Sequence, residues 1–230
     1  MTKHGKKYNK ARELLGTKTS FPLQEGVAKV KELAHARFDE SVDANINLGI
    51  DPSKGEQVVR GSVILPHTIG KKVRILAFAK GDYGDAAQKA GADFVGVEDF
   101  IAKIESGWMD FDYAVATPDL MGLVGKVAKI LGPRGLLPNK KSGTVTFDVA
   151  AIISDLKKGR LFFKNDKNAI VHFRFGKAKA LSASQLAENL NVFLKALATC
   201  KPPTSKGKFI KKISISSTMG PGIHIVTDEL

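Results

Sequence analysis

Leu131-Gly132-Pro133-Arg134-Gly135-Leu136-Leu137-Pro138-Asn139-Lys140-Lys141-Ser142-Gly143-Thr144 contains three glycines and two prolines in fourteen residues. Proline lacks an amide donor and glycine is unfavourable inside a helix, so the helix that precedes this stretch cannot continue through it. Its three leucines are apolar, which is unusual for a solvated linker. The composition predicts a rigid, partly packed loop that carries Arg134, Lys140 and Lys141. On composition alone, a structural connector with solvated charges is the more common interpretation.

The residues around this loop alternate between short apolar strands and helices. Apolar runs at 73–79, 94–97 and 113–116 are separated by helical segments at 83–90 and 98–105. Two further helices are expected at 117–131 and 149–158. Strands that alternate with helices form a parallel sheet with helices on its faces. The middle of the chain is therefore predicted to be a three-layer, Rossmann-like α/β domain.

Toward both ends of the chain the predicted strands are half-buried instead. Residues 42–50 alternate apolar and polar side chains, which predicts a strand with one polar face. Strands at 161–163 and 170–175 flank a polar, hairpin-like loop. The remaining predicted elements are strands at 58–65 and 208–217, a helix-compatible segment at 1–20, and helices that begin after Pro22 and at Ser182 or Ser184.

The charge is unevenly distributed along the chain. The whole sequence has a net charge of +13, with 36 basic and 23 acidic residues. Residues 68–158 hold 13 basic and 11 acidic residues, so the outer segments hold the other 23 and 12. This favours an α+β outer domain that is discontinuous, 1–67 plus 159–230, with 68–158 inserted as the α/β domain. Two independent basic domains would give the same counts.

The basic surplus points to nucleic acid as the partner, with a membrane surface as the alternative. No segment approaches the ~18 apolar residues of a spanning helix. The N-terminal lysines lack the apolar core of a secretory signal. A single cysteine, Cys200, excludes an internal disulfide, and a cytosolic protein is the simplest interpretation.

Enzyme motifs are absent or incomplete. The loop Ala79-Lys80-Gly81-Asp82-Tyr83-Gly84 lacks the first glycine of a dinucleotide-binding loop. In Gly122-Leu123-Val124-Gly125-Lys126-Val127 the spacing of a phosphate loop is wrong, and Val127 cannot ligate magnesium. The five histidines lie far apart in the sequence without the spacing of metal ligands: His4, His35, His67, His172 and His224. We expect no enzyme, no cofactor and no metal, with an α/β enzyme and an unspecific basic protein as the alternatives.

An RNA-binding surface is better supported by the residues near the C-terminus. Small hydroxyls at Ser214, Ser216, Ser217 and Thr218 precede a turn that Gly220 and Gly222 keep narrow. Such a surface lets a nucleic-acid backbone approach closely, and Met219 can pack on a ribose or a base. An ordinary serine-rich strand that ends in a turn has the same pattern. If the surface binds RNA, Thr218→Ala should weaken binding with little change in stability.

Two other stretches have a composition that suits RNA. Arg37-Phe38-Asp39 places an aromatic beside a cation, which suits base stacking, although a phenylalanine at the edge of the core is more common. Lys164 and Lys167 could serve phosphates. Asp166, between them, would repel a phosphate and should instead bond to a 2′-hydroxyl or a base amine, or orient a lysine.

Five blocks of the sequence resemble the ribosomal protein L-one family of the large ribosomal subunit in its bacterial form. They are Val124–Pro138 (Val-Gly-Lys-Val-Ala-Lys-Ile-Leu-Gly-Pro-Arg-Gly-Leu-Leu-Pro), Arg37-Phe38-Asp39-Glu40, Leu48-Gly49-Ile50-Asp51-Pro52, Gly107-Trp108-Met109-Asp110-Phe111-Asp112 and Thr218-Met219-Gly220-Pro221. They occur in the family's order and span almost the whole chain. The resemblance implies the same two-domain fold with an inserted domain.

The resemblance also implies the function and the partners. A member of this family binds the rRNA of the mobile stalk and assists release of deacylated tRNA from the exit site. It also represses translation by binding its own operon mRNA. It is a monomer when free, it belongs to the cytoplasmic ribosome, and it contacts no membrane. Lys54 and Arg60 could face the tRNA.

The expected contacts with rRNA and mRNA combine the residues that match the family's binding segments with their polar neighbours. They are Arg37, Phe38, Asp39, Ser41, Lys164, Asp166, Lys167, Asn168, His172, Ser214, Ser216, Ser217, Thr218, Met219, Gly220 and Pro221. Lys212 lies near the binding strand, at a position where relatives can carry a small polar residue, so a direct contact from it is doubtful.

Overall fold

The structure is a computed structural model that describes residues 5–16, 20–68, 70, 72–205 and 207–226. The chain divides into two compact units, which are described one at a time. Unit 1 consists of Met1–Ile69 and Phe162–Leu230, and unit 2 is Gly70–Leu161. Both units combine helices with strands, which confirms the predicted fold class.

Unit 1 is built on a five-stranded sheet with the order β1-β10-β9-β2-β8. Only β1 and β10 are parallel, and every other neighbouring pair is antiparallel. The short strands β1, at the edge, and β10, next to it, were not predicted from the sequence, because two or three residues show no periodicity. The strands span Ser20–Phe21 (β1), Ile223–Ile225 (β10), Ile210–Ser217 (β9), Ser41–Leu48 (β2) and Ile170–Lys177 (β8).

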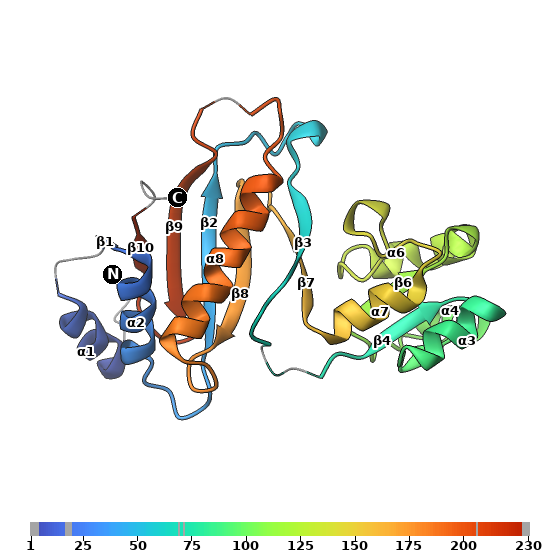
Figure 1. Cartoon of the computed structure of the whole chain (residues 1–230), viewed down its shortest axis with the longest axis horizontal. Helices are drawn as coiled ribbons and strands as arrows, with labels where there is room; N and C mark the ends of the chain where they lie inside the picture. The colour runs from blue at the N-terminus through green and yellow to red at the C-terminus, as the bar shows by residue number, and fades with distance from the viewer. Residues whose placement is uncertain (1–4, 17–19, 69, 71, 206, 227–230) are drawn as a thin grey trace. The chain divides into compact units, whose positions relative to one another are not determined.

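Two helices, α2 (Leu23–Leu33) and α8 (Ala183–Thr199), cover one face of this sheet (Figure 1). Ser182 caps α8 in a capping box with Gln185, in which each side chain bonds to the other residue's backbone. The sheet approaches α8 closely at Gly176, where a Cβ would collide with Leu186, and approaches α2 at Gly26. A short N-terminal helix, α1 (Lys6–Leu15), packs against α2.

Unit 1 also contains a two-stranded sheet of β3 (Arg60–Ile64) and β7 (Arg160–Lys164), with a short turn η1 (Gly55–Gln57) before β3. The loop between β7 and β8 is hairpin-like, as predicted, with an antiparallel bridge between Asn165 and Val171, but the two strands otherwise pair elsewhere: β7 with β3 and β8 with β2. Phe193 of α8 fixes this arrangement by stacking on Phe173 and meeting Phe163 edge-on, with centroid distances of 3.7 and 5.2 Å.

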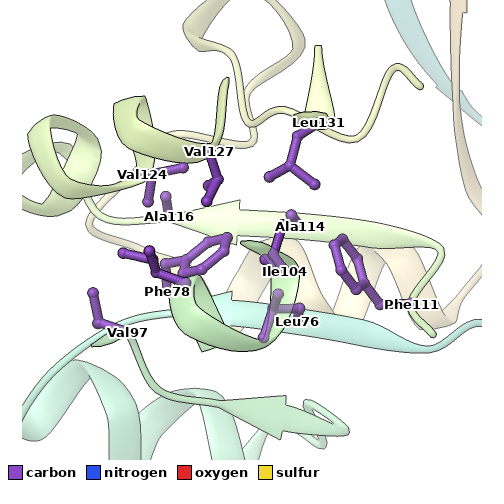
Figure 2. Close-up of a cluster of buried hydrophobic side chains, with 11 residues drawn as sticks. Leu76, Phe78, Val97, Ile104, Phe111, Ala114, Ala116, Val124, Val127 and Leu131 are labelled. Atoms are coloured by element: carbon purple, nitrogen blue, oxygen red, sulfur yellow. The ribbon is translucent and has the colours of Figure 1, made fainter. Parts of the chain in front are cut away.

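Unit 2 contains the predicted parallel sheet, with the order β5-β4-β6. Its strands are β4 (Ile75–Phe78), β5 (Phe94–Val95) and β6 (Tyr113–Ala116), and its helices include α3 (Asp82–Lys89), α4 (Glu98–Glu105) and α7 (Val149–Lys157). All four residues of β4 are buried, as in a strand covered on both faces. Figure 2 shows part of the core, where Phe78 and Leu76 meet Ile104 and side chains from the segment after β6.

The segment after β6 is helical over residues 118–131, as expected, but it is not one regular α-helix. It alternates between 3-10 and α-helical turns: η2 (Pro118–Leu120), α5 (Met121–Val124), η3 (Gly125–Val127) and α6 (Ala128–Leu131). Two glycines, Gly122 and Gly125, lie inside this segment and weaken regular helix.

The glycine- and proline-rich loop that follows is partly packed, as predicted. Leu131 is fully buried, and Leu136 and Leu137 pack against the core of unit 2. The loop closes where Asn139 donates its N–H to the hydroxyl of Thr144 at 2.8 Å and Thr144 returns its N–H to the Asn139 carbonyl at 3.2 Å. A last short turn, η4 (Lys140–Ser142), precedes this closure.

Candidate nucleic-acid interface

The face of the five-stranded sheet that α2 and α8 do not cover carries polar side chains. On β2, Val42, Ala44, Ile46 and Leu48 are buried, whereas the polar residues between them are partly or fully exposed. The cross-strand register places three polar rows beside each other on this open face: Asp43 with Arg174 and Ser216, Asn45 with His172 and Ser214, and Asn47 with Lys212.

The polar groups of the open face hold each other in place. His172 Nδ1 lies 2.7 Å from Asn45 Oδ1, and the Arg174 guanidinium lies 3.4 Å from the Asp43 carboxylate. Ser214 bonds to His224 Nδ1 at 2.8 Å. Burial, and then the positive charge of Lys212, hold the pKa of His224 below its usual value, which favours the neutral ring. The face therefore offers oriented donors and acceptors rather than a concentrated positive charge.

At one end of this face, the loop at residues 36–41 meets the turn at residues 217–221; we call these two segments the Met219 cluster. Phe38 and Met219 are both 53% exposed there, and Arg37 and Thr218 are also exposed. The exposed position of Phe38 resolves the earlier ambiguity against an edge-of-core role. The large apolar side chains of Phe38 and Met219 are thus exposed to solvent in the same cluster as the Arg37 cation and the Thr218 hydroxyl.

A buried carboxylate joins the two halves of the Met219 cluster. Glu40 is 1% exposed and accepts the backbone N–H of Ala36 at 2.6 Å and that of Met219 at 3.0 Å. Burial would raise the pKa of Glu40, but the nearby Ser217 hydroxyl and the hydrogen bonds from these two amides outweigh it, so the pKa lies below its usual value. The charged form of Glu40 therefore fixes the position of Met219 relative to the 36–41 loop.

Two lysines on the chain after β8 hold the same loop from its other side. Lys177 donates to the Asp39 carbonyl at 3.0 Å, and Lys179 donates to the Arg37 carbonyl at 2.9 Å. The Asp39 carboxylate accepts the backbone N–H of Lys179 at 2.9 Å. Asp39 is therefore occupied within the protein, and the loop presents Arg37 and Phe38 at its tip.

The opposite end of the open face carries residues 164–169, which we call the Lys164 loop. Asp166 accepts the backbone N–H groups of Asn168 and Ile170, both at 2.8 Å, and these bonds hold the turn together. Asp166 is thus a turn-forming residue, and its other carboxylate oxygen lies 3.5 Å from His172 Nε2. Ile170 first and then Asn168 hold the pKa of Asp166 below its usual value. Lys164, Lys167 and Asn168 are exposed around it.

The Lys164 loop is tied to the chain before β3. Asn165 is buried, accepts the backbone N–H of Val59 at 2.8 Å, and returns its own N–H to the Val59 carbonyl at 3.1 Å. This pairing places the exposed Arg60 next to the loop. Lys54 is also exposed, and its ammonium lies 3.9 Å from the Asp51 carboxylate.

Several expected contact residues have a different role in the structure. Ser217 and Ser41 are buried, at 4% and 7% exposure, and Pro221 is buried as well. Ser217 has the same parity as Ile213 and Ile215 on β9, so its hydroxyl lies on the core side of the strand, where the geometry shows no hydrogen-bond partner for it within the described residues. These three residues shape the Met219 cluster and do not present side chains to a ligand.

Thr218 is exposed, but its hydroxyl is already engaged. It accepts the backbone N–H of Ser41 at 3.0 Å and donates to the Ser41 carbonyl at 3.3 Å. Ser214, Ser216, His172 and Gly220 remain partly or fully accessible on the open face or its rim. The predicted residues therefore form two groups at opposite ends of β2, about 25 Å apart at the usual strand rise, joined by the open face.

The sequence analysis missed Glu40, Lys177, Lys179 and Asn45. A signal for Glu40 exists, since it continues the inward parity of Val42 and Ala44. Within the described ranges, no group of three His, Cys, Asp or Glu residues gathers as a metal ion would require. The same part of the chain has no helix of the length and apolar character that a membrane crossing needs. His4 lies outside the described residues.

A comparison with protein families agrees with the interpretation of this surface as a nucleic-acid interface. A family model described as the ribosomal protein L1p/L10e family matches residues 30–221, which is 192 of the 230 residues. The match includes both the Met219 cluster and the Lys164 loop, and it runs through all of unit 2. The chain belongs to the ribosomal protein L1p/L10e family, and is therefore an RNA-binding protein of the large ribosomal subunit and not an enzyme.

Proposed function

We propose that the chain binds the rRNA of the large-subunit stalk along the open sheet face of unit 1. The observation that carries this is the Met219 cluster, where Phe38 and Met219 are exposed yet held in place by a buried carboxylate. Exposed large apolar side chains on a rigid frame are typical of a recognition surface, because the fold itself gains nothing from exposing them.

The remainder of the surface supplies the other parts of RNA recognition. Lys164 and Lys167 at the far end and Arg37 at the near end can contact phosphates. Between them, the amide of Asn45 and the hydroxyls of Ser214 and Ser216 offer small polar contacts to 2′-hydroxyls and base edges. Phe38 can stack on an unpaired base. A structured, largely double-helical RNA with such a base matches this distribution.

The experiment measures binding of the full chain to the stalk rRNA fragment and to a scrambled duplex of equal length, each across a salt series. We expect tighter binding to the stalk fragment, with a selectivity that persists as salt rises. Phe38→Ala with Met219→Ala should reduce the preference for the stalk at least tenfold, since one stacked base contributes about 1–3 kcal/mol. Leu14→Ala with Ile64→Ala, at other exposed apolar positions of unit 1, is the matched control. Equal binding to both RNAs would contradict the proposal.

We further infer that the protein is a bacterial member that works as a monomer on the cytoplasmic ribosome and also contacts exit-site tRNA. Arg60 supports the tRNA contact, since Asn165 holds its neighbour Val59 beside the Lys164 loop. Arg60→Gln and Lys54→Gln should then slow tRNA release from the ribosome without changing binding to the stalk fragment. An unchanged release rate would mean that these two cations do not contact the tRNA.

The same surface is proposed to repress translation of the protein's own operon mRNA. One rigid surface can bind two RNAs that present similar shapes, and feedback requires the rRNA to bind more tightly. Competition between the stalk fragment and the leader mRNA should therefore favour the stalk. Comparable affinities would contradict this ordering.

A further inference from the structure

Two large aromatic side chains of unit 2 are exposed next to each other. Tyr83, in the first turn of α3, and Phe147, shortly before α7, are 44% and 49% exposed, and their ring centroids lie 5.9 Å apart. We call these two residues the aromatic pair. The helix α3 packs against α7, and at the far end of both helices Lys157 lies beside Gly91. The two helices therefore run parallel, with both N-termini at the end that carries the aromatic pair.

The backbone beneath the aromatic pair is held by hydrogen bonds. Thr146 donates its N–H to the carbonyl of Ala116 in β6 at 3.1 Å, and its hydroxyl accepts the N–H of Asp148 at 3.1 Å. Asp148 in turn caps α7 by accepting the N–H of Ala151 at 3.2 Å. Phe147 thus lies between a bond to the sheet and a helix cap. A single exposed apolar side chain is ordinary, whereas a rigid pair of exposed aromatic rings is a surface that a partner can cover.

The surroundings of the aromatic pair are acidic, although the chain has a net charge of +13. Asp82 and Asp85 on α3 and Asp148 at the start of α7 are all exposed. In the described part of the chain, the ion pairs use none of these three carboxylates. Lys80, two residues before Asp82, is paired with Glu98 at 2.9 Å. Carboxylates at helix N-termini also stabilise the helices, so they do not by themselves indicate a site, but they determine which charge a partner of the rings must carry.

We propose that the aromatic pair binds a protein segment that is rich in arginine or lysine. A guanidinium can lie flat on a tyrosine or phenylalanine ring and can bond at the same time to a carboxylate beside that ring. RNA is less suited to this surface, because the carboxylates repel phosphates and phosphate contacts dominate the affinity for nucleic acid. A largely apolar partner is less suited as well, because two rings within a charged rim offer only a small apolar area. The contact is independent of the RNA-binding surface of unit 1.

The first test titrates the full chain with a synthetic peptide of alternating arginine and glycine, and with the same peptide in which uncharged citrulline replaces arginine. The wild type should bind the arginine peptide more tightly, and the NMR signals of Tyr83 and Phe147 should shift. Tyr83→Ala with Phe147→Ala should weaken the binding about fivefold to tenfold, because both cation–π contacts are lost. Equal binding of the two peptides, or unchanged binding in the double variant, would overturn the proposal.

The matched control is Phe38→Ala with Met219→Ala, which removes two exposed apolar side chains in the same cluster as the Arg37 cation. It should bind the arginine peptide as the wild type does, while it loses its preference for the stalk fragment. Tyr83→Ala with Phe147→Ala should show the reverse. Failure of the wild type to prefer the stalk fragment counts against the surface of unit 1 alone. Reduced RNA binding with unchanged peptide binding in the Tyr83 and Phe147 variant would assign the aromatic pair to RNA and overturn the protein contact.

A second test changes the charge and keeps both rings. Asp82→Asn with Asp85→Asn should weaken binding of the arginine peptide several-fold and make that binding less sensitive to salt, because two carboxylates beside the rings are lost. Glu105→Gln with Asp110→Asn is the matched control, since it removes two exposed carboxylates of unit 2 where α4 ends and before β6 begins. This control should bind the peptide nearly as the wild type does. Equal losses in the two double variants would mean that the peptide responds only to the net charge of the chain, and would overturn the aromatic pair as its site.

Discussion

The two ends of the five-stranded sheet are built by different means. In the Met219 cluster, hydrogen bonds join residues that are far apart in the sequence: Met219 to Glu40, Thr218 to Ser41 and Lys179 to Asp39. In the Lys164 loop, Asn165 is tied to Val59, but the turn that presents the lysines is held by Asp166, which bonds to amides only two and four residues further along. Long-range bonds hold apolar side chains at one definite position, whereas a local turn needs only to present charge. We therefore expect the first end to provide specificity and the second to provide salt-dependent affinity.

The largest expected effect is on stability at the Met219 cluster. Glu40→Ala removes the acceptor of two partly buried backbone N–H groups, together with a buried side chain, which should lower the free energy of unfolding by about 3 kcal/mol. Asp39→Ala, in the same loop, removes one half-exposed acceptor and should cost about 1 kcal/mol. Urea denaturation measures both. Equal losses for the two variants would mean that Glu40 does not join the two segments.

The next largest expected effect tests whether the Lys164 loop provides affinity without selectivity, unlike the Met219 cluster. Lys164→Gln with Lys167→Gln removes two exposed cations without touching the bonds of Asp166. It should weaken binding to the stalk fragment and to the scrambled duplex equally, about tenfold, and make the salt slope shallower by about 2. Loss of selectivity in this variant, measured by the ratio of the two affinities, would show that the Lys164 loop also reads the structure of the RNA.

Thr218 allows a finer test, and here the structure corrects an expectation. The sequence alone predicts that Thr218→Ala affects RNA binding with little effect on stability. Since the hydroxyl bonds to both backbone groups of Ser41, the substitution should instead cost about 1 kcal/mol of unfolding free energy. Thr218→Ser keeps the hydroxyl and should restore most of that stability. Thermal unfolding of the two variants decides between the two roles.

The smallest expected effect is a change of the unfolding free energy with pH that occurs only at acidic pH. The pKa of Glu40 is lower in the folded protein than its ordinary value, so its contribution to stability is present above that ordinary value and is lost as the pH falls through the folded pKa. Unfolding free energy should therefore decline below about pH 4. In Glu40→Gln the decline of the unfolding free energy should be smaller but not absent, because Asp166 still contributes to it. Urea titrations at several pH values measure this difference. An identical acid profile in this variant would exclude Glu40 as the titrating group.

Most of the secondary structure follows from local pattern. The alternation at 42–50, the apolar runs of unit 2 and the helix that Ser182 caps all appear in the structure within a few residues of the predicted positions. The predicted helix at 117–131 is helical in the structure, but it alternates between 3-10 and α-helical turns because the exposed glycines weaken regular helix. The loop between β7 and β8 is hairpin-like, yet β7 pairs along its length with β3, because adjacent strands in sequence need not be partners in a sheet.

By itself, the sequence determined the strands and helices, the basic surplus and the residue types of the binding segments. These depend on periodicity and composition, which act over a few residues. Only the tertiary structure decided that Ser217 turns inward, that Thr218 is bonded to Ser41, and that Phe38 and Met219 stand together in solvent. Those facts depend on the register of β2 against β9 and on bonds between residues nearly 180 positions apart, which local patterns do not encode.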